Sequence, residues 1–318
     1  MQPRSAASDL QPARCATSTS ESPLPTPGAA SLARAARPRL LALAVHWDDC
    51  SVALGNGESI VSELWSGQPE RASARAGAAD AAAAGGSPIA SRDALLLLDR
   101  LLAKSGASLS DIDRLCFARG PGAFTSLRVA AGLVQGLSLA TSIPVTGICS
   151  LAALIAHEPG WRGGDGQGAW LQLAALDARM GECYFGVHLC LGGSHPTVVL
   201  APAVGSPARA VAAFESALVH HPGTRPVLAG NGFRLLPELA GWAERTGHDP
   251  ERAGARVPTA AAVLAVAASA GAPAPGPARS ALPVYVRDKI ALDVGEQLAN
   301  ATARALSEPK AGAARTAT

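Results

Sequence analysis

The stretch RGPGAFTSLRVAAGLVQGLSLATS, residues 119–142, decides the fold that this sequence predicts. A β-rich run at 115–118 leads into Gly120-Pro121-Gly122. This tripeptide is typical of a turn, because glycine adopts backbone angles that other residues avoid. The apolar residues that follow the turn predict a helix, so the stretch is interpreted as a strand, a tight turn and a helix in sequence.

The predicted helix, at about 123–140, has one face of small residues. Gly132, Gly136 and Ala140 recur at every fourth position and therefore share a face. A face without bulk lets another helix approach closely. We interpret this helix as the central packing helix of a first domain and as a candidate interface. Its apolar contacts are expected from Phe124, Leu127, Val134 and Leu137.

Composition limits the classes of function. The chain has 318 residues, 48% of them hydrophobic, which suggests about two domains with real cores. The net charge of +2 gives no general attraction to nucleic acid or to an anionic membrane. No signal peptide or apolar run long enough to span a membrane is visible, and none of the 6 cysteines is spaced as CxxC. We therefore expect a cytoplasmic protein with no membrane contact.

The pattern along the chain predicts two domains. Residues 1–39 are rich in Ser, Ala, Pro and Arg without a hydrophobic period, so a disordered extension is expected, with an organelle transit peptide as the alternative. A first domain is predicted at 40–158, a second, smaller domain at 169–292, and a disordered tail at 297–318. Strands are expected in the first domain at 40–45, 51–55, 59–65, 115–118 and 145–148, with helices at 91–105, at 123–140 and from a Ser150 cap to about 157.

The second domain is predicted to repeat this order in reduced form. Three strands should precede a helix and a further strand, and 282–287 should be a short strand or extended segment. Such an order predicts a mixed sheet with helices on its faces. The expected strands are 170–176, 183–191, 197–201 and 227–229, and the expected helices are 207–220 and 259–270.

Four stretches resemble motifs of the TsaB family. They are GPGAFTSLRVAAGLVQGLSLA at 120–140, SLAALIAHE at 150–158, LDARMGECYF at 176–185 and LPVYVRDKIAL at 282–292. They occur in the family's order, and the resemblance extends over about 40–292. The element order is also that of the sugar kinase, actin and chaperone ATPase superfamily.

The resemblance implies a fold and a role. The fold is α/β, with two actin-like (RNase H-like) domains, a mixed five-stranded sheet flanked by helices, and a degenerate second domain. The role is that of a non-catalytic subunit without a cofactor or metal. It forms a heterodimer with the catalytic subunit TsaD and joins the ATPase TsaE in a ternary complex, and a homodimer without the partner is left open. The complex makes N6-threonylcarbamoyladenosine next to the anticodon, so tRNA is reached through the complex.

The resemblance also implies where the partner binds. The family's dimer interface uses two helices of the first domain, which correspond here to 91–104 and 124–140. Arg128 could contact a partner, tRNA or an anion at the turn of residues 120–122, and a solvated or internally paired side chain is the other interpretation. The candidate partner-binding residues are Leu95, Leu98, Leu102, Phe124, Leu127, Arg128, Gly132 and Gly136.

A second candidate site is a cleft between the domains. Asp177, Arg179 and Glu182 could form a polar site there, and a hairpin turn with a local ion pair is the alternative. Gly120 and Gly122 precede a helix, so their amides could bind the phosphate of a nucleotide. Either arrangement would place a ligand between the domains.

Other features argue against catalysis by this chain. The superfamily's phosphate-binding turn carries an Asp after the first strand, whereas this sequence has AVHW at 44–47. An alanine cannot orient metal-bound water. No two histidines have the HxxxH spacing through which the catalytic paralogues bind a metal. The alternative function is a catalytically active superfamily member, a metal-dependent glycopeptidase-like hydrolase or transferase.

Overall fold

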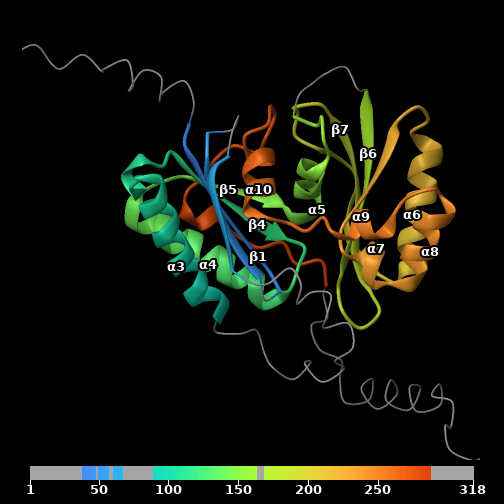
Figure 1. The fold of residues 1–318 in the computed structure, drawn as a ribbon, viewed down its shortest axis with the longest axis horizontal. Coiled ribbons are helices and arrows are strands. Elements are labelled where there is room, and N and C mark those ends of the chain that lie inside the picture. The colour runs from blue at the N-terminus through green and yellow to red at the C-terminus, as the bar shows by residue number, and fades with distance from the viewer. Residues whose placement is uncertain (1–37, 48, 57–59, 67–88, 163–167, 288–318) are drawn as a thin grey trace, which may run out of the picture. The chain divides into compact units, whose positions relative to one another are not determined.

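The computed structural model describes 38–47, 49–56, 60–66, 89–162 and 168–287, all within one compact unit that starts at Arg37. The strands of this part form two sheets, both covered by helices (Figure 1). The predicted tail and almost all of the predicted N-terminal extension lie outside the described residues. The division into two domains at the predicted boundaries stays a prediction.

The first sheet has five strands in the order β3-β2-β1-β4-β5. β1 pairs antiparallel with β2 and parallel with β4, β2 pairs antiparallel with β3, and β4 pairs parallel with β5. The predicted mixed five-stranded sheet is therefore confirmed. Its strands are β1 Leu40–His46, β2 Asp49–Gly55, β3 Ile60–Ser66, β4 Arg114–Gly120 and β5 Val145–Cys149.

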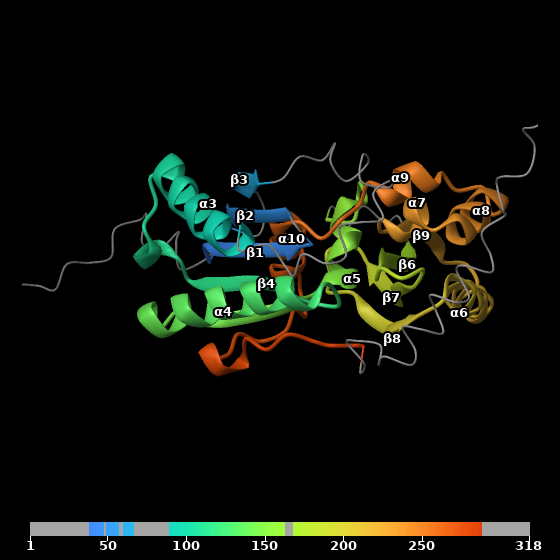
Figure 2. The same cartoon turned by 90° about the horizontal axis from the view of Figure 1, so that it is seen from below.

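Alternating side chains of β1 belong to two different cores, as expected for a strand with both faces covered. Leu41, Leu43 and Val45 pack with α3 (Ile89–Ser105) and α4 (Phe124–Thr141). Leu40, Ala42 and Ala44 pack on the other side with α10 (Ala260–Ala267). Figure 2 shows α4 lying along the first sheet. The predicted helix at 123–140 is thus confirmed as a packing helix of this sheet.

The second sheet has four strands in the order β8-β7-β6-β9 and lacks a counterpart of β5 among the described residues. This matches the predicted degenerate copy. On its outer face lie α6 and α8 (Figure 1). The strands are β6 Ala169–Asp177, β7 Cys183–Leu191, β8 Thr197–Gly205 and β9 Arg225–Ala229, and the helices are α6 Pro207–His220, α7 Gly232–Leu235, α8 Pro237–Arg245 and α9 Pro250–Gly254.

Three short helices, α7 to α9, were not predicted. For α9 a signal exists, because Asp249 caps it by accepting the amides of Glu251 and Arg252, and Pro250 opens it. The predicted Ser150 cap is wrong: Ser150 is the first residue of α5 (Ser150–Ala153), which continues as the 3₁₀ helix η4 (Leu154–His157), and Cys149 precedes it.

The two sheets share a core through α10 and α5. Trp161 and Trp170 are buried together with α10 residues and with residues of the first sheet. A buried ion pair reinforces this contact: Arg256 donates to Glu158 at 2.6 Å and to the Leu228 carbonyl at 3.0 Å. α10 therefore packs on the first sheet although it follows the second sheet in the chain.

The chain after α10 returns along the first sheet. Gly276 exchanges two backbone hydrogen bonds of 2.8 Å with Val145 of β5. Gln135 of α4 donates to the Ala281 carbonyl at 3.0 Å, and Ala281 is buried in the core under α4. Residues 282–287 then run without regular secondary structure, which agrees with the predicted extended segment.

Candidate functional site

The small-residue face of α4 is open to solvent in this chain. Gly132, Gly136 and Ala140 are exposed, and a Cβ added at either glycine would meet nothing within 4 Å. Leu139 on the same stripe is 76% exposed. The opposite face of the helix is anchored in the core through Leu127, Ala130, Ala131 and Val134. Within the described part of the chain, α4 thus presents an unpartnered face of small residues on a firmly packed helix.

The other predicted partner-binding residues divide by exposure. Leu98 and Leu127 are buried in the chain's own core, so their assignment to a partner surface is corrected. Leu95 is 50% exposed and lies beside the exposed Leu96. The helical phase explains the difference, because α3 turns Leu97 and Leu101 toward the sheet.

Leu102 and Phe124 are partly buried and Arg128 is exposed. Together with Leu95, Gly132 and Gly136, these residues form the exposed or half-exposed part of the predicted partner-binding set, on α3 and α4.

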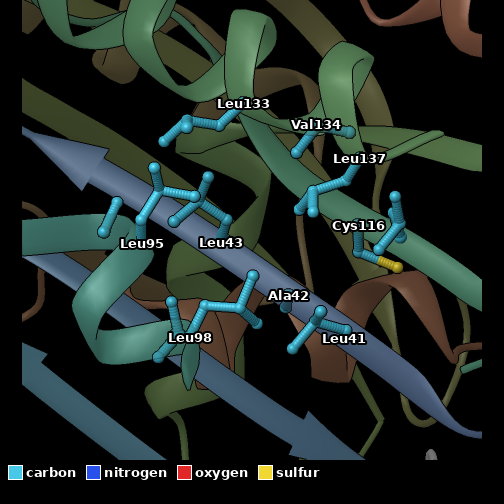
Figure 3. Close-up of a pocket in the computed structure, with 12 residues that line it drawn as sticks. Leu41, Ala42, Leu43, Leu95, Leu98, Cys116, Leu133, Val134 and Leu137 are labelled. Atoms are coloured by element: carbon cyan, nitrogen blue, oxygen red, sulfur yellow. The ribbon is translucent and has the colours of Figure 1, made fainter. Parts of the chain in front are cut away.

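Beneath these helices lies a small apolar cavity of about 20 Å³. Leu133, Val134 and Leu137 of α4 and Leu95 and Leu98 of α3 surround it above β1 (Figure 3). A water molecule there would find almost no hydrogen-bond partner, because aliphatic side chains make up nearly all of the lining. The cavity is therefore a gap in packing between α3, α4 and the sheet.

The turn between β6 and β7 forms the second candidate site. The Asp177 carboxylate accepts a hydrogen bond from the Arg179 backbone amide at 2.9 Å and forms an ion pair with the Arg179 guanidinium at 3.5 Å. Asp177 also donates its own amide to Asn231 at 2.9 Å. Arg179 and Met180 have φ of 64° and 57°, so the Asp177 side chain stabilises a left-handed turn. The predicted local ion pair is present.

Glu182 does not join that pair. Its carboxylate accepts a hydrogen bond from the Arg287 guanidinium at 2.5 Å. Arg287 also donates a hydrogen bond to the Ala178 carbonyl at 3.2 Å. The expectation that Asp177, Arg179 and Glu182 act as one polar group is therefore corrected to two ion pairs. Sequence could not reveal this, because Arg287 and Glu182 lie 105 residues apart.

Arg179 extends from this turn to the end of β1. Its guanidinium carbon lies 4.2 Å from the centre of the Trp47 ring. Burial, and secondarily the charge of Arg179, lowers the pKa of His46 to about 4. At neutral pH His46 is thus an uncharged residue packed beside the turn, and Trp47 is a stacking surface for Arg179.

The Gly120 turn lies at the same end of the first sheet. Gly120 has a φ of 117°, and a Cβ there would approach the Val284 carbonyl oxygen to 2.5 Å. Val284 also donates its amide to the Arg119 carbonyl at 2.7 Å. The close approach of residue 284 explains why position 120 needs glycine. Gly122 is partly buried, beside Leu127.

Three of the four sequence motifs, as far as the structure describes them, therefore meet in space. Ser126 at the start of α4 donates to the Trp47 carbonyl at 2.9 Å, which links the helix to the end of β1. Arg179 covers Trp47, and the segment 284–287 contacts Arg119, α4 and the β6–β7 turn. The motifs are distant in sequence but form one contiguous region next to the exposed face of α4.

The described residues of this region do not resemble a metal centre. Within the described ranges, no three His, Cys, Asp or Glu side chains are grouped so that they could hold a metal ion. Ala44, at the position of the superfamily's Asp, is 1% exposed and packs in the core between β1 and α10. None of the helices that the structure describes is both long and apolar enough to cross a membrane.

Comparison with known proteins finds relatives of this chain. The family model of TsaD, tRNA N6-adenosine threonylcarbamoyltransferase, matches residues 90–229. The tRNA threonylcarbamoyladenosine biosynthesis protein TsaB of Escherichia coli K12 is 42% identical over 91 residues, which are 29% of this chain and 37% of that protein. The tRNA N6-adenosine threonylcarbamoyltransferase of Solidesulfovibrio magneticus is 49% identical over 57 residues, 18% of this chain and 15% of that protein.

A solved structure extends the likeness to the whole described fold. YeaZ from Pseudomonas aeruginosa is 28% identical, with a TM-score of 0.52 over 78% of this chain and 99% of that chain. The sequence matches to the two curated relatives, in contrast, span less than half the length of those proteins.

Proposed function

The chain belongs to the TsaB (YeaZ) family, and on this basis we propose that it is a non-catalytic subunit in the synthesis of N6-threonylcarbamoyladenosine in tRNA. In this proposal it forms a heterodimer with the catalytic subunit TsaD and activates it, in the cytoplasm. TsaE joins them in a ternary complex, and tRNA is bound through the complex.

One observation carries this proposal: the open glycine face of α4. A methyl group added at Gly132 or Gly136 would have no neighbour within 4 Å, so the backbone of a second helix could approach closely there. The core under α4 is ordered by buried aliphatic side chains, so the surface is preformed. Exposed Leu95, Leu96 and Leu139 would supply apolar contacts around the close approach.

The alternative is a catalytically active member of the superfamily. It is favoured by the match of 90–229 to the family model of an enzyme. It is disfavoured by Ala44, which fills the superfamily's Asp position with a buried methyl group, and by Val284, whose carbonyl occupies the space beside Gly120. The two functions differ in whether this chain alone turns over a substrate.

Reconstitution separates the two functions. The chain is co-purified with TsaD and TsaE of its own organism, and tRNA modification is measured with and without it. We expect the three-protein mixture to modify tRNA, and omission of this chain to stop the reaction. Turnover of a substrate by this chain alone would instead support the alternative, a catalytically active superfamily member.

A matched pair of variants connects the result to α4. Gly132→Leu and Gly136→Leu should leave the circular dichroism spectrum unchanged, because both positions open to solvent, but should abolish co-purification with TsaD. Gly241→Leu places the same bulk on α8, where an added Cβ meets only the flexible end of Arg245 at 3.4 Å, and should bind TsaD normally. Normal binding by both α4 variants would contradict the proposed interface.

A further inference from the structure

Arg128 carries an unusual charge for its position on α4. It is the single charged residue among the 18 of this helix and lies in the second turn. No acidic residue occupies the first turn. The helix dipole favours anions at the N-terminus and falls off within the first turn, so it gives this cation no stabilisation. The chain thus places an exposed positive charge where its own helix does not stabilise it.

The guanidinium of Arg128 is nevertheless held in one place. Its central carbon lies 4.2 Å from the centre of the Phe124 ring, and its Nε donates to the Tyr285 hydroxyl at 3.3 Å. The Phe124 and Tyr285 rings lie 5.1 Å apart. Stacking and one hydrogen bond fix the plane of the guanidinium, so little side-chain entropy is left to lose on binding.

This arrangement leaves most of the Arg128 donors for another molecule. Only Nε is engaged, and within the described part of the chain no carboxylate pairs with Arg128. The planar fork of a guanidinium suits a carboxylate, which can accept two parallel hydrogen bonds.

Arg128 also belongs to the open stripe of α4. Positions 128, 132 and 136 are spaced by four residues and lie on one face, and all three are exposed. A helix seated against Gly132 and Gly136 would therefore extend past Arg128. Phosphate of RNA is a poorer match, because the rest of the stripe consists of uncharged residues and the chain's net charge is only +2.

From these observations we infer that Arg128 binds an acidic side chain of the protein partner that docks on α4. Phe124 and Tyr285 are positioning residues that hold the guanidinium in place. The C-terminal segment therefore takes part in the interface through Tyr285, although it comes from the other end of the chain. This inference rests on the proposed function and identifies the chemistry that sets its specificity.

The test is calorimetric titration of TsaD into the wild-type chain and into four variants, at low and high NaCl. Arg128→Gln should weaken binding about tenfold and reduce the salt dependence of the affinity. Arg128→Lys should recover part of the loss, and Tyr285→Phe, which removes one hydrogen bond, should cost about threefold. Arg209→Gln is the matched control, since Arg209 is also an exposed arginine near an aromatic ring, 5.9 Å from the centre of Phe185.

The outcomes separate this inference from the proposed function. If wild type binds TsaD and Arg128→Gln binds equally well with an unchanged salt dependence, the inference is overturned and the proposed function stands. If Arg128→Gln retains TsaD binding but the complex loses affinity for tRNA, Arg128 contacts RNA, and the inference is also overturned. If wild type fails to bind TsaD, the proposed function falls and the inference with it.

Discussion

Replacing Gly132 and Gly136 by alanine should stabilise the isolated chain. Both residues lie inside α4, where glycine is about 0.8–1.0 kcal/mol less favourable than alanine. An added methyl group would meet nothing within 4 Å, so no clash offsets this gain. Each substitution should therefore raise the free energy of unfolding by about 1 kcal/mol, and the pair by about 2 kcal/mol.

The assay is urea unfolding followed by circular dichroism. The midpoint should rise while the slope stays constant, because the surface exposed on unfolding hardly changes. Melting temperature should rise by about 2–4 °C for each substitution. Gly230→Ala is the opposite control: Gly230 has a φ of 121°, and a Cβ would lie 1.9 Å from the Ala175 carbonyl oxygen.

The same alanines should weaken binding to TsaD, because they fill the space that a second helix would use. The effect on folding and the effect on binding thus have opposite signs. A lower urea midpoint for either variant would refute the reasoning, since it would mean that the glycine face is covered in the free protein. Sedimentation at several protein concentrations would then show whether a second copy covers it.

Other predictions concern buried polar groups and the cavity. Arg256→Met should cost about 3–5 kcal/mol in urea unfolding because it leaves the Glu158 carboxylate buried without its partner, and adding Glu158→Leu should recover much of the loss. Burial, with the nearby charge of His195 as the smaller cause, lowers the pKa of His188 to about 4. The unfolded-state pKa is about 6.5, so the stability that neutral His188 contributes is complete above about pH 6.5 and is lost as the pH falls toward 4, by up to about 3 kcal/mol. Urea midpoints measured from pH 7 to pH 4 should therefore fall in the wild type, and fall less steeply in His188→Gln. The same decrease of the midpoint with pH in wild type and variant would contradict this prediction. Leu98→Ala should enlarge the cavity under α3 and cost about 2–5 kcal/mol, with a loss below 1 kcal/mol arguing that the site collapses.

The strand and helix order could be predicted because both signals are local. Alternating or continuous apolar runs mark β1, β4 and β6, and the Gly120 turn followed by apolar residues marks α4. Hydrophobic periodicity does not predict α7 to α9, because runs of 4 to 9 residues are too short to show a helical period. The Asp249 cap and Pro250 at the start of α9 are a sequence signal for one of them. Their formation depends on packing against the second sheet.

The candidate site was less predictable, since it depends on contacts between distant residues. The pairing of Arg287 with Glu182 and the approach of Val284 to Gly120 require the C-terminal segment to return to the first sheet. The rotation of α3 about its axis was also not predictable, because a leucine-rich helix has several apolar faces. Only the structure shows that Leu97 is buried and Leu95 is exposed. Arg128 is a candidate from the sequence alone, whereas its aromatic support is not, because Tyr285 lies 157 residues away.

The position of α10 has a consequence for synthesis on the ribosome. The inner face of the first sheet is closed by residues 260–267, and Ala281 fills the core below α4. When the five strands of that sheet have emerged, the segment that covers them has not yet been translated. Until then the nascent first sheet has an exposed apolar face. Chaperones bind such partly folded chains, and aggregation can start from them. Folding of the amino-terminal half is completed only after residues 260–281 have left the exit tunnel.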